Sequence, residues 1–382
     1  MTVIKSDKII LSDGVYAGYI SINAGKITAV TDQMQNGEVT YDYTGKYVSP
    51  GLIDLHTHGA GGHGFTDSSP AEVAAGCNVH LTHGTTSIFP TVMAAPFEVM
   101  EKSLSNIAAA KKSGQVKSHL IGAHLEGPYL SAAQCGAQCP TYITPPVPQE
   151  YEALIAEYGA DIARWTYAPE SDSDGVFAAY LQSHGILPSA GHTNATYKDI
   201  RTAIDNGMRL ITHLYSCTST VTRDHGFRSL GVIESAFLRD ELFVEIIADG
   251  KHLPPDLVRM IIKIKGKDKV ALVTDSLDIA ATDQVCGQFK GGTAFIVEDG
   301  VCKLPDRTAF AGSIATADQL IRVMRDECGF DLTDAIYMMT QVPATLMGLN
   351  KGGIRAGADA DLIVFDEQIQ VSDVFVGGQK VI

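Results

Sequence analysis

Short apolar segments that alternate with amphipathic helical stretches fill the middle of this 382-residue chain and constrain its fold more than any other feature. Each apolar segment has the length of a β-strand, and the stretches between them have the periodicity of helices. Repeated strand–helix units build a parallel sheet, and eight of them close a barrel. The pattern therefore predicts an α/β protein built on a (β/α)8 TIM barrel. The eight strand segments are 52–58, 85–91, 119–126, 164–168, 186–192, 209–214, 243–249 and 271–275.

The helical stretches complete this pattern. They include 98–112, 151–158 and 257–264, and two more follow the last strand segment, at 317–325 and 333–346.

The two ends of the chain have a different sequence pattern. Residues 8–30 contain short β-rich segments separated by glycine turns, and 360–376 return to the same pattern. We expect the two ends to pair in one small β-sandwich domain, formed by 1–50 and 352–382. Residues 51–351 would then be the barrel domain, inserted between the two halves.

Charge and cysteine content narrow the class of protein. Lys and Arg number 29 against 44 Asp and Glu, without a basic cluster, which argues against nucleic acid or an anionic membrane as partner. No apolar run approaches the roughly 18 residues of a membrane-spanning helix, and the first residues lack a signal-peptide pattern. Seven scattered cysteines do not suggest a disulfide framework. We therefore expect a cytoplasmic protein.

The first strand segment ends in His56-Thr57-His58. Side chains alternate along a strand, so both imidazoles face the same side and can bind one ion. An isolated pair of this kind is as easily explained by two structural histidines. Its interpretation as a metal site depends on the groups at the other strand ends.

Three further candidate ligands end other strand segments, at the face where barrels carry their functional residues. Glu126 ends the third segment, and a buried carboxylate needs a cation or a proton. His192 and His213 end the fifth and sixth segments. His124 is better explained as a core histidine or as support for a ligand. Imidazole and carboxylate ligands suit Zn²⁺ or Fe²⁺, and we expect one or two ions per chain, with Zn²⁺ preferred.

The last two strand segments contribute groups that can move protons or bind substrate. Asp275 ends the eighth segment, where it can take a proton from a water that a metal has made acidic and return it to a leaving nitrogen. A plain ligand or a helix cap is the alternative role for Asp275. His252 follows the seventh segment and is a candidate substrate-binding residue.

Together these motifs resemble the amidohydrolase superfamily and, within it, the N-acetylglucosamine-6-phosphate deacetylases. The resemblance covers almost the whole chain, and the order of the motifs makes it specific. They are Ser49-Pro50-Gly51-Leu52-Ile53-Asp54-Leu55-His56-Thr57-His58, His83-Gly84-Thr85-Thr86-Ser87, His124-Leu125-Glu126-Gly127-Pro128, Gly191-His192-Thr193, Thr212-His213-Leu214-Tyr215, the stretch 247–252, Thr274-Asp275, Ala311-Gly312-Ser313 and the stretch 353–362.

The resemblance implies that Glu126, His192 and His213 hold the main metal, that His56 and His58 supply a second one, and that Asp275 activates water. It also implies removal of the acetyl group from a 2-acetamido sugar, and a homodimer whose partner reaches into the phosphate site. Some residues depart from the family pattern. Candidate substrate-binding residues therefore include Gln138 in place of a histidine, Ser216 and Cys217 in place of Asn-Ala, and Arg223 or Arg228 for the phosphate.

Two other functions are compatible with parts of the sequence. One is a different N-acyl deacylase or cyclic-amide hydrolase of the superfamily. Such enzymes commonly use a carboxylated lysine on strand four, and the segment Trp165 to Glu170 contains no lysine. The other is a catalytically silent barrel with a binding role, which is less compatible with a complete set of ligands and Asp275.

Overall fold

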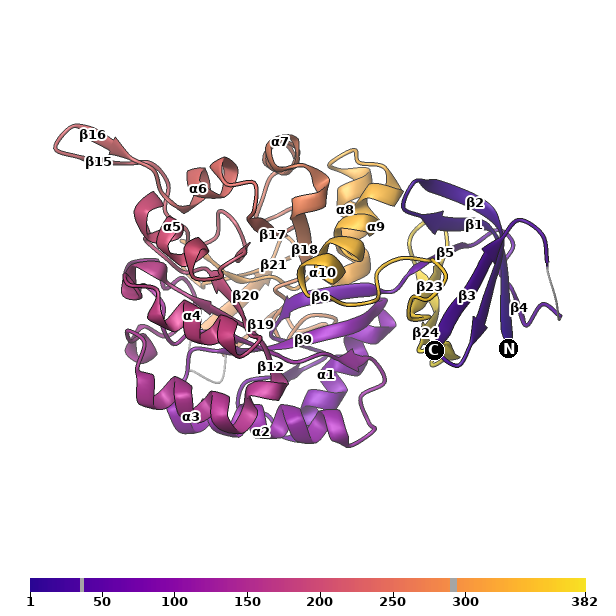
Figure 1. Cartoon of the computed structure of the whole chain (residues 1–382), viewed down its shortest axis with the longest axis horizontal. Coiled ribbons are helices and arrows are strands. Elements are labelled where there is room, and N and C mark those ends of the chain that lie inside the picture. Colours follow the sequence, from indigo (N-terminus) through magenta and orange to yellow (C-terminus); the bar gives the residue numbers. More distant parts are fainter. Residues whose placement is uncertain (35–37, 289–293) are drawn as a thin grey trace.

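The computed structural model describes residues 1–34, 38–288 and 294–382, and its central feature is the predicted parallel barrel (Figure 1). Each strand pairs in parallel with its neighbours, and β10 and β11 together occupy one strand position beside β9. The ring closes where the backbone N–H of Asp275 donates to the carbonyl oxygen of His56 at 2.9 Å. In ring order the strands are β6 (Leu52–Thr57), β9 (Thr85–Met93), β10 (His119–Leu120) with β11 (Ala123–Glu126), β12 (Ile162–Tyr167), β13 (Leu187–Ala190), β14 (Leu210–Ile211), β17 (Phe243–Ile247) and β18 (Val270–Val273).

Helices cover the outside of the barrel, as the amphipathic pattern predicts. Local sequence explains where they begin: Ser69 and Glu72 form a reciprocal capping box ahead of the first helix, which has Pro70 at its first position. The helices are α1 (Pro70–Thr82), α2 (Phe97–Lys112), α3 (Pro148–Tyr158), α4 (Val176–Ser183), α5 (Tyr197–Asp205), α6 (Val232–Leu238), α7 (Pro255–Lys265), α8 (Ala317–Asp326), α9 (Leu332–Met338) and α10 (Gln341–Leu346). Short 3-10 turns are η1 (Ala132–Gln134), η2 (Pro140–Tyr142), η3 (Gly159–Asp161), η4 (Pro169–Ser171) and η5 (Lys267–Lys269).

One helix prediction was wrong. The single helix expected over 333–346 is broken into α9 and α10 around Thr340. Pro343 explains the break, because a proline inside a helix lacks an N–H donor and its ring clashes with the carbonyl one turn earlier.

The two ends of the chain pair in one sheet, as expected. Strand β5 lies between the two ends: it runs parallel to β1 and antiparallel to β23, with Val48 opposite Val364. Both termini lie at the same end of the molecule (Figure 1). The strands of this sheet are β1 (Thr2–Leu11), β2 (Gly14–Asn23), β3 (Lys26–Thr31), β4 (Tyr41–Asp42), β5 (Tyr47–Pro50), β23 (Leu362–Phe365), β24 (Val371–Val376) and β25 (Gln379–Lys380).

This terminal sheet folds over on itself and encloses its own core. Ile27 of β3 and Phe375 of β24 come from distant strands of the sheet, yet both belong to one buried apolar cluster. The backbone N–H of Ile27 also donates to the carbonyl of Ala358 at 2.9 Å, which brings the two layers together. The predicted sandwich is thus one continuous curled sheet. We propose the domain boundaries 50/51 and 351/352, which are supported by the end of β5 at Pro50 and the start of β6 at Leu52.

Several β elements were not predicted. A hairpin of β15 (Thr222–Asp224) and β16 (Phe227–Ser229) projects from the barrel (Figure 1). A four-stranded antiparallel sheet follows β18, and a two-stranded one follows β6. These strands are β19 (Cys286–Gln288), β20 (Ala294–Glu298), β21 (Val301–Lys303), β22 (Phe310–Gly312), β7 (Gly59–Ala60) and β8 (His63–Gly64). In the described parts of the chain, no helix is long and apolar enough to cross a membrane.

Candidate metal centre and active site

The candidate ligands stand where the chain leaves the carboxyl ends of the barrel strands. His56 lies within β6, and Glu126 is the last residue of β11. His192, His213 and Asp275 each come two residues after a strand, and their φ angles of 46°, 28° and 46° lie in the left-handed region. Non-glycine residues adopt this conformation at a cost of about 1–3 kcal/mol, and such strain concentrates at functional sites.

Glu126 contacts two of the histidines through one oxygen. Its Oε1 lies 3.1 Å from Nε2 of His192 and 3.0 Å from Nε2 of His213, and the two imidazole nitrogens are 3.1 Å apart. All three residues are buried. These donors belong to three different strand positions, so the closing of the barrel is what brings them together.

The other histidine pair contacts Glu126 as well, with Nε2 of His56 3.5 Å from the same Oε1. Nε2 of His56 and Nε2 of His58 are 3.3 Å apart, and Nε2 of His58 is 3.3 Å from Oε2 of Glu126. Oδ1 of Asp275 lies 3.2 Å from Nε2 of His56 and 3.0 Å from Nε2 of His58. Glu126 is therefore shared by the two groups of candidate ligands, and Asp275 adjoins the one that contains the His-x-His pair.

The spacing of these atoms fits divalent metal ions. A tetrahedral ion with ligand bonds of about 2.0–2.1 Å sets neighbouring donor atoms roughly 3.3 Å apart. Within each of the groups His56–His58–Glu126 and Glu126–His192–His213, the donor atoms lie within 4.8 Å of one another. Nitrogen atoms this close, in a buried site, need a shared proton or cation between them. The donor set of imidazole and carboxylate is the one that Zn²⁺ and Fe²⁺ accept.

The electrostatic potential of the site also favours a cation. Burial lowers the pKa of His56, but the carboxylates of Asp275 and Glu126 outweigh it and raise this pKa to about 10. Burial raises the pKa of Asp275, but His56 and His58 hold it below its usual range. The carboxyl groups are thus ionised at neutral pH, and they attract positive charge to the site.

Comparison with known proteins identifies the family. The sequence profile of the amidohydrolase family matches residues 47–381. The chain belongs to the amidohydrolase family. N-acetylglucosamine-6-phosphate deacetylase of Bacillus subtilis (strain 168) is 30% identical over 362 residues, which are 93% of this chain and 90% of that protein. N-acetylgalactosamine-6-phosphate deacetylase of Shewanella sp. (strain ANA-3) is 29% identical over 371 residues, covering 97% of this chain and 90% of that one.

Solved structures agree with this assignment. A point mutant of N-acetyl-D-glucosamine-6-phosphate deacetylase from Mycobacterium smegmatis, in complex with N-acetyl-D-glucosamine-6-phosphate, superposes with a TM-score of 0.91. That structure is 28% identical in sequence and covers 100% of this chain and 99% of its own. The barrel, the terminal sheet and the order of elements are therefore those of an amidohydrolase fold.

Gln138 of this amidohydrolase lies beside the candidate ligands, in the loop between η1 and η2. Its side chain is buried, with Nε2 donating to Oε2 of Glu126 at 2.7 Å and Oε1 accepting from the backbone N–H of Ala94 at 3.0 Å. Both ends of the amide are thereby used, and Gln138 orients Glu126. Contact between Gln138 and a substrate stays a prediction.

Cys217 lies against the same loop. Its φ of 52° is left-handed. A Cβ added to Gly136 would lie 2.5 Å from Sγ of Cys217 and 3.4 Å from Cε1 of His192, so only glycine fits between the thiol and the imidazole. The neighbouring Ser216 is half-buried, and its backbone N–H donates to the carbonyl of His213 at 2.9 Å. Both residues thus border the cluster, and their contact with substrate stays a prediction.

His252 lies at the mouth of the site, near Asp275. Its Nδ1 is 2.7 Å from Oδ2 of Asp249, and its ring meets that of Phe310 edge to face with centroids 5.1 Å apart. Burial lowers the pKa of His252, but Asp249 and Asp275 raise it above its ordinary value. Phe310 belongs to the unpredicted four-stranded sheet, which therefore forms part of the rim.

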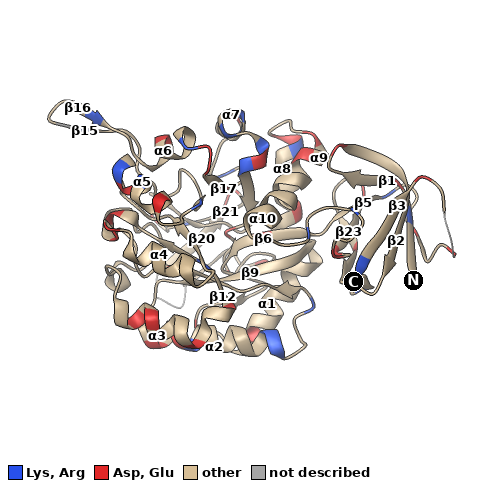
Figure 2. Cartoon of the chain, viewed as in Figure 1, with Lys and Arg blue, Asp and Glu red and all other residues tan. Residues whose placement is uncertain are grey.

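The structure does not bring the two candidate phosphate arginines to the metal cluster of their own chain. Arg223 and Arg228 face each other across the hairpin β15–β16, and both are exposed. Figure 2 shows blue segments on the projecting hairpin, away from the barrel axis. The reason is local: 222–229 pair with each other as a two-stranded ribbon and so leave the barrel surface.

Sequence reasoning missed a backbone carbonyl that supports one ligand, whereas for His124 it had named two roles, a core position or support for a ligand. The carbonyl of Gln134 lies 2.9 Å from Nδ1 of His192, and nothing in the loop sequence distinguishes this carbonyl from its neighbours. His124 is a buried core histidine, bonded to Oγ1 of Thr91 at 3.1 Å and to Oγ1 of Thr166 at 2.7 Å. Burial and the nearby Arg164 hold its pKa well below the ordinary value, so His124 is neutral.

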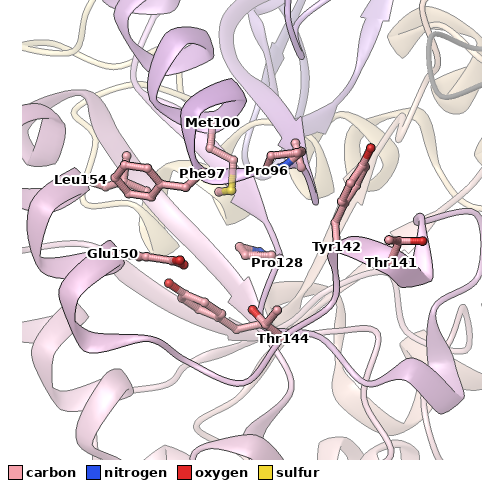
Figure 3. A pocket seen from close by; sticks show the side chains of 11 residues that line it. Pro96, Phe97, Met100, Pro128, Thr141, Tyr142, Thr144, Glu150 and Leu154 are labelled. Atoms are coloured by element: carbon pink, nitrogen blue, oxygen red, sulfur yellow. The ribbon is translucent and has the colours of Figure 1, made fainter.

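A separate cavity of about 190 Å³ lies behind the loop that carries Gln138. Phe97, Met100, Pro128 and Leu154 give it apolar walls, and Glu150 is its charged lining residue (Figure 3). None of the candidate metal ligands lines it. The candidate ligands and Asp275 therefore lie at the barrel mouth and not in this cavity.

Proposed function

We propose that this amidohydrolase removes the acetyl group from an N-acetylated amino sugar, N-acetylglucosamine-6-phosphate or a close analogue. The observation that carries the proposal is the position of Asp275: its carboxylate lies within 3.2 Å of two candidate metal ligands, at the open end of a barrel whose relatives include deacetylases of such sugars. Hydrolysis of an amide needs a proton acceptor, a proton donor and polarisation of the carbonyl. The site contains groups for each of these tasks.

The ligand groups determine where metal would bind. Glu126, His192 and His213 would hold the main ion, and His56 with His58 would hold a second one beside Glu126. A bound divalent ion supplies two effects: it polarises the acetyl carbonyl and makes a nearby water acidic near pH 7. We prefer Zn²⁺, with Fe²⁺ as the alternative, because both accept nitrogen and oxygen donors.

Asp275 would move the proton. Its carboxylate is ionised at neutral pH, because His56 and His58 lower its pKa against the effect of burial. It can accept the proton of the attacking water on one oxygen and then donate that proton to the sugar nitrogen as the C–N bond breaks. Free amine and acetate are the products, and Asp275 returns to its starting charge.

Sequence similarity does not select one sugar. Relatives named for the glucosamine and the galactosamine compounds are almost equally similar, at 30% and 29% identity. Neither Arg223 nor Arg228 contacts the cluster of its own chain. In the proposed homodimer, a phosphate beside this cluster would be held by the hairpin of the partner subunit. The alternative substrate is another N-acyl amino sugar or related amide, without a phosphate.

The test is kcat/KM for N-acetylglucosamine, N-acetylgalactosamine and their 6-phosphates. A phosphate held by two arginines favours its ligand by about 3–6 kcal/mol, which is at least a hundredfold in kcat/KM. We expect a weaker preference, within about tenfold, because Arg223 and Arg228 depart from the family pattern in spacing and Gln138 replaces a histidine. A preference above a hundredfold that is lost in Arg223→Ala or Arg228→Ala would contradict this expectation. No turnover of any acetamido sugar would refute the proposed function.

We also propose a homodimer and a cytoplasmic location. The projecting hairpin supports the first, because its Phe227 is 80% exposed and offers an apolar contact to a partner surface. The second is supported by the seven cysteines, which are all free thiols, as expected for a reducing compartment.

A further inference from the structure

A buried ion pair lies inside the barrel beneath His56. Arg164 of β12 and Glu245 of β17 both have fully buried side chains, and Nη1 of Arg164 donates to Oε1 of Glu245. Nη2 of Arg164 donates to Oε2 of Glu245 at 3.3 Å and to Oγ1 of Thr212 at 3.0 Å. Most barrels fill this interior with branched apolar side chains. The pair is therefore an unusual feature of this chain.

Stability alone does not explain a buried pair of this kind. Removing two charges from water costs about as much as their attraction returns, and apolar replacements of similar volume are often neutral or stabilising. The pair is better explained if a third side chain interacts with the charged carboxylate of Glu245.

His56 is that side chain. Oε2 of Glu245 lies 3.6 Å from Nδ1 of His56, and within the described residues this nitrogen has no hydrogen-bond partner. Nε2 of the same ring is directed at His58 and Asp275, at 3.3 and 3.2 Å. A histidine that binds metal through one nitrogen usually donates its other N–H to a carboxylate or a carbonyl, which selects the tautomer and orients the ring.

The other ligand group contains the same arrangement. Nδ1 of His192 is directed at the carbonyl of Gln134 at 2.9 Å, while its Nε2 is directed at Glu126. Glu245 would do for His56 what the Gln134 carbonyl does for His192. The ring of His124, edge-on with centroids 4.5 Å apart, packs against His56 and limits its rotation.

We propose that Glu245, held in place by Arg164, is a positioning residue that orients His56 toward a divalent ion bound by the His56–His58–Glu126 group. The proposal rests on the proposed function only in requiring that this group binds metal. Loss of such a supporting carboxylate usually weakens metal affinity by about 10–100-fold. The side chains of the Glu126–His192–His213 group have no hydrogen bond or ion pair with Glu245 among the described residues, so metal affinity there should be unchanged.

Two neutral double variants test this role without leaving a buried charge. Arg164→Met with Glu245→Gln retains a carbonyl oxygen that can accept from Nδ1 of His56. Arg164→Met with Glu245→Met has nearly the same volume but no acceptor. Zn²⁺ affinity of each site is measured by competition with a chromophoric chelator, and stoichiometry by elemental analysis. We expect two ions in the parent and in the glutamine variant, and about 10–100-fold weaker binding of one ion in the methionine variant.

Equal affinities in the two double variants, or a parent that binds a single ion, would overturn the proposal. Glu245→Asp provides a second measurement if a double variant does not fold, because it keeps the charge opposite Arg164 but withdraws the carboxylate from His56. It should also weaken one site, and unchanged binding would again overturn the proposal. Turnover of acetamido sugars by the parent is assayed separately. An inactive parent whose variants still differ in Zn²⁺ binding would refute the function and support the role of Glu245.

Discussion

At the scale of single residues, the site depends on charges that compensate one another. Glu126 contacts both pairs of histidines, and Asp275 adjoins one of these pairs. Each carboxylate stays ionised in a buried position only because imidazoles surround it. Neutralising one of these carboxylates therefore affects activity differently from truncating the side chain. A conservative variant, which removes the charge and keeps the shape, can test this difference.

We expect Asp275→Asn to lower kcat by about 10²–10⁴-fold, because an amide cannot accept the proton of water. Metal content and folding should change little, since the asparagine keeps the shape of the side chain. Steady-state kinetics with elemental analysis check this, and Asp306→Asn, in an exposed loop, serves as the control. Nearly normal turnover would mean that another group accepts the proton, and His252 would be the next candidate.

That the five candidate ligands and Asp275 lie close together could be predicted from sequence, because the carboxyl ends of parallel barrel strands converge. Arg164 and Glu245 could not be found in this way. Each is one charged residue in a strand that is otherwise mostly apolar, and its partner lies on a different strand. The available signal was Arg164 itself, because an arginine in a strand buried on both faces needs a carboxylate nearby.

At the scale of elements, polar contacts connect the strands to the helices around them. His80 of α1 is fully buried, with Nε2 2.9 Å from Oγ1 of Thr57 and 3.0 Å from the carbonyl of Gly59. This histidine joins α1 to the turn that follows the His-x-His strand. Burial lowers its pKa to about 4, an effect that the Gly59 carbonyl partly offsets.

This pKa predicts a dependence of stability on pH. His80 takes up a proton more readily in the unfolded chain, whose histidine pKa is 6.5, than in the folded one, at about 4. The contribution of His80 to the free energy of unfolding is therefore fully present above pH 6.5. It is lost as the pH falls toward 4, and the total loss is on the order of 3 kcal/mol. In His80→Gln this part of the pH dependence should be absent. Urea unfolding at about pH 7.5, 6 and 5, in the presence of a chelator, measures it, with the exposed His184→Gln as control. If the free energy of unfolding changed with pH by the same amount in the parent and in His80→Gln, the low pKa assigned to His80 would be contradicted.

The barrel strands could be predicted from the sequence, whereas the small antiparallel hairpins and sheets could not. All eight strand positions of the barrel follow from apolar runs, because a strand covered on both faces is apolar throughout. The hairpin 222–229 lacks such a run, and the strands β19 to β22 are short; both structures are stabilised by pairing with near neighbours in sequence. Phe310 at the rim of the site was missed for this reason.

At the scale of the whole molecule, the hairpin β15–β16 is the feature on which we base the proposed dimer. It projects from the barrel and exposes Phe227 at 80%. We expect the parent to sediment as a dimer and Phe227→Ser to dissociate at least about tenfold more readily, since burying a phenylalanine side chain contributes about 1.5–3 kcal/mol. Val176→Ser on α4, also exposed, should leave association unchanged. A monomeric parent, or a dimer that Phe227→Ser leaves unaffected, would show that the hairpin has another role.

The terminal sheet has a consequence for how the protein is made. Val48 of β5 pairs with Val364 of β23, so the edge of β5 is unpaired until almost the whole chain has been synthesised. At typical translation rates this takes on the order of tens of seconds, during which an apolar strand edge is open to pairing with other nascent chains. A ribosome that stops before Leu362 therefore releases a chain that can complete the barrel strands but cannot close its first sheet.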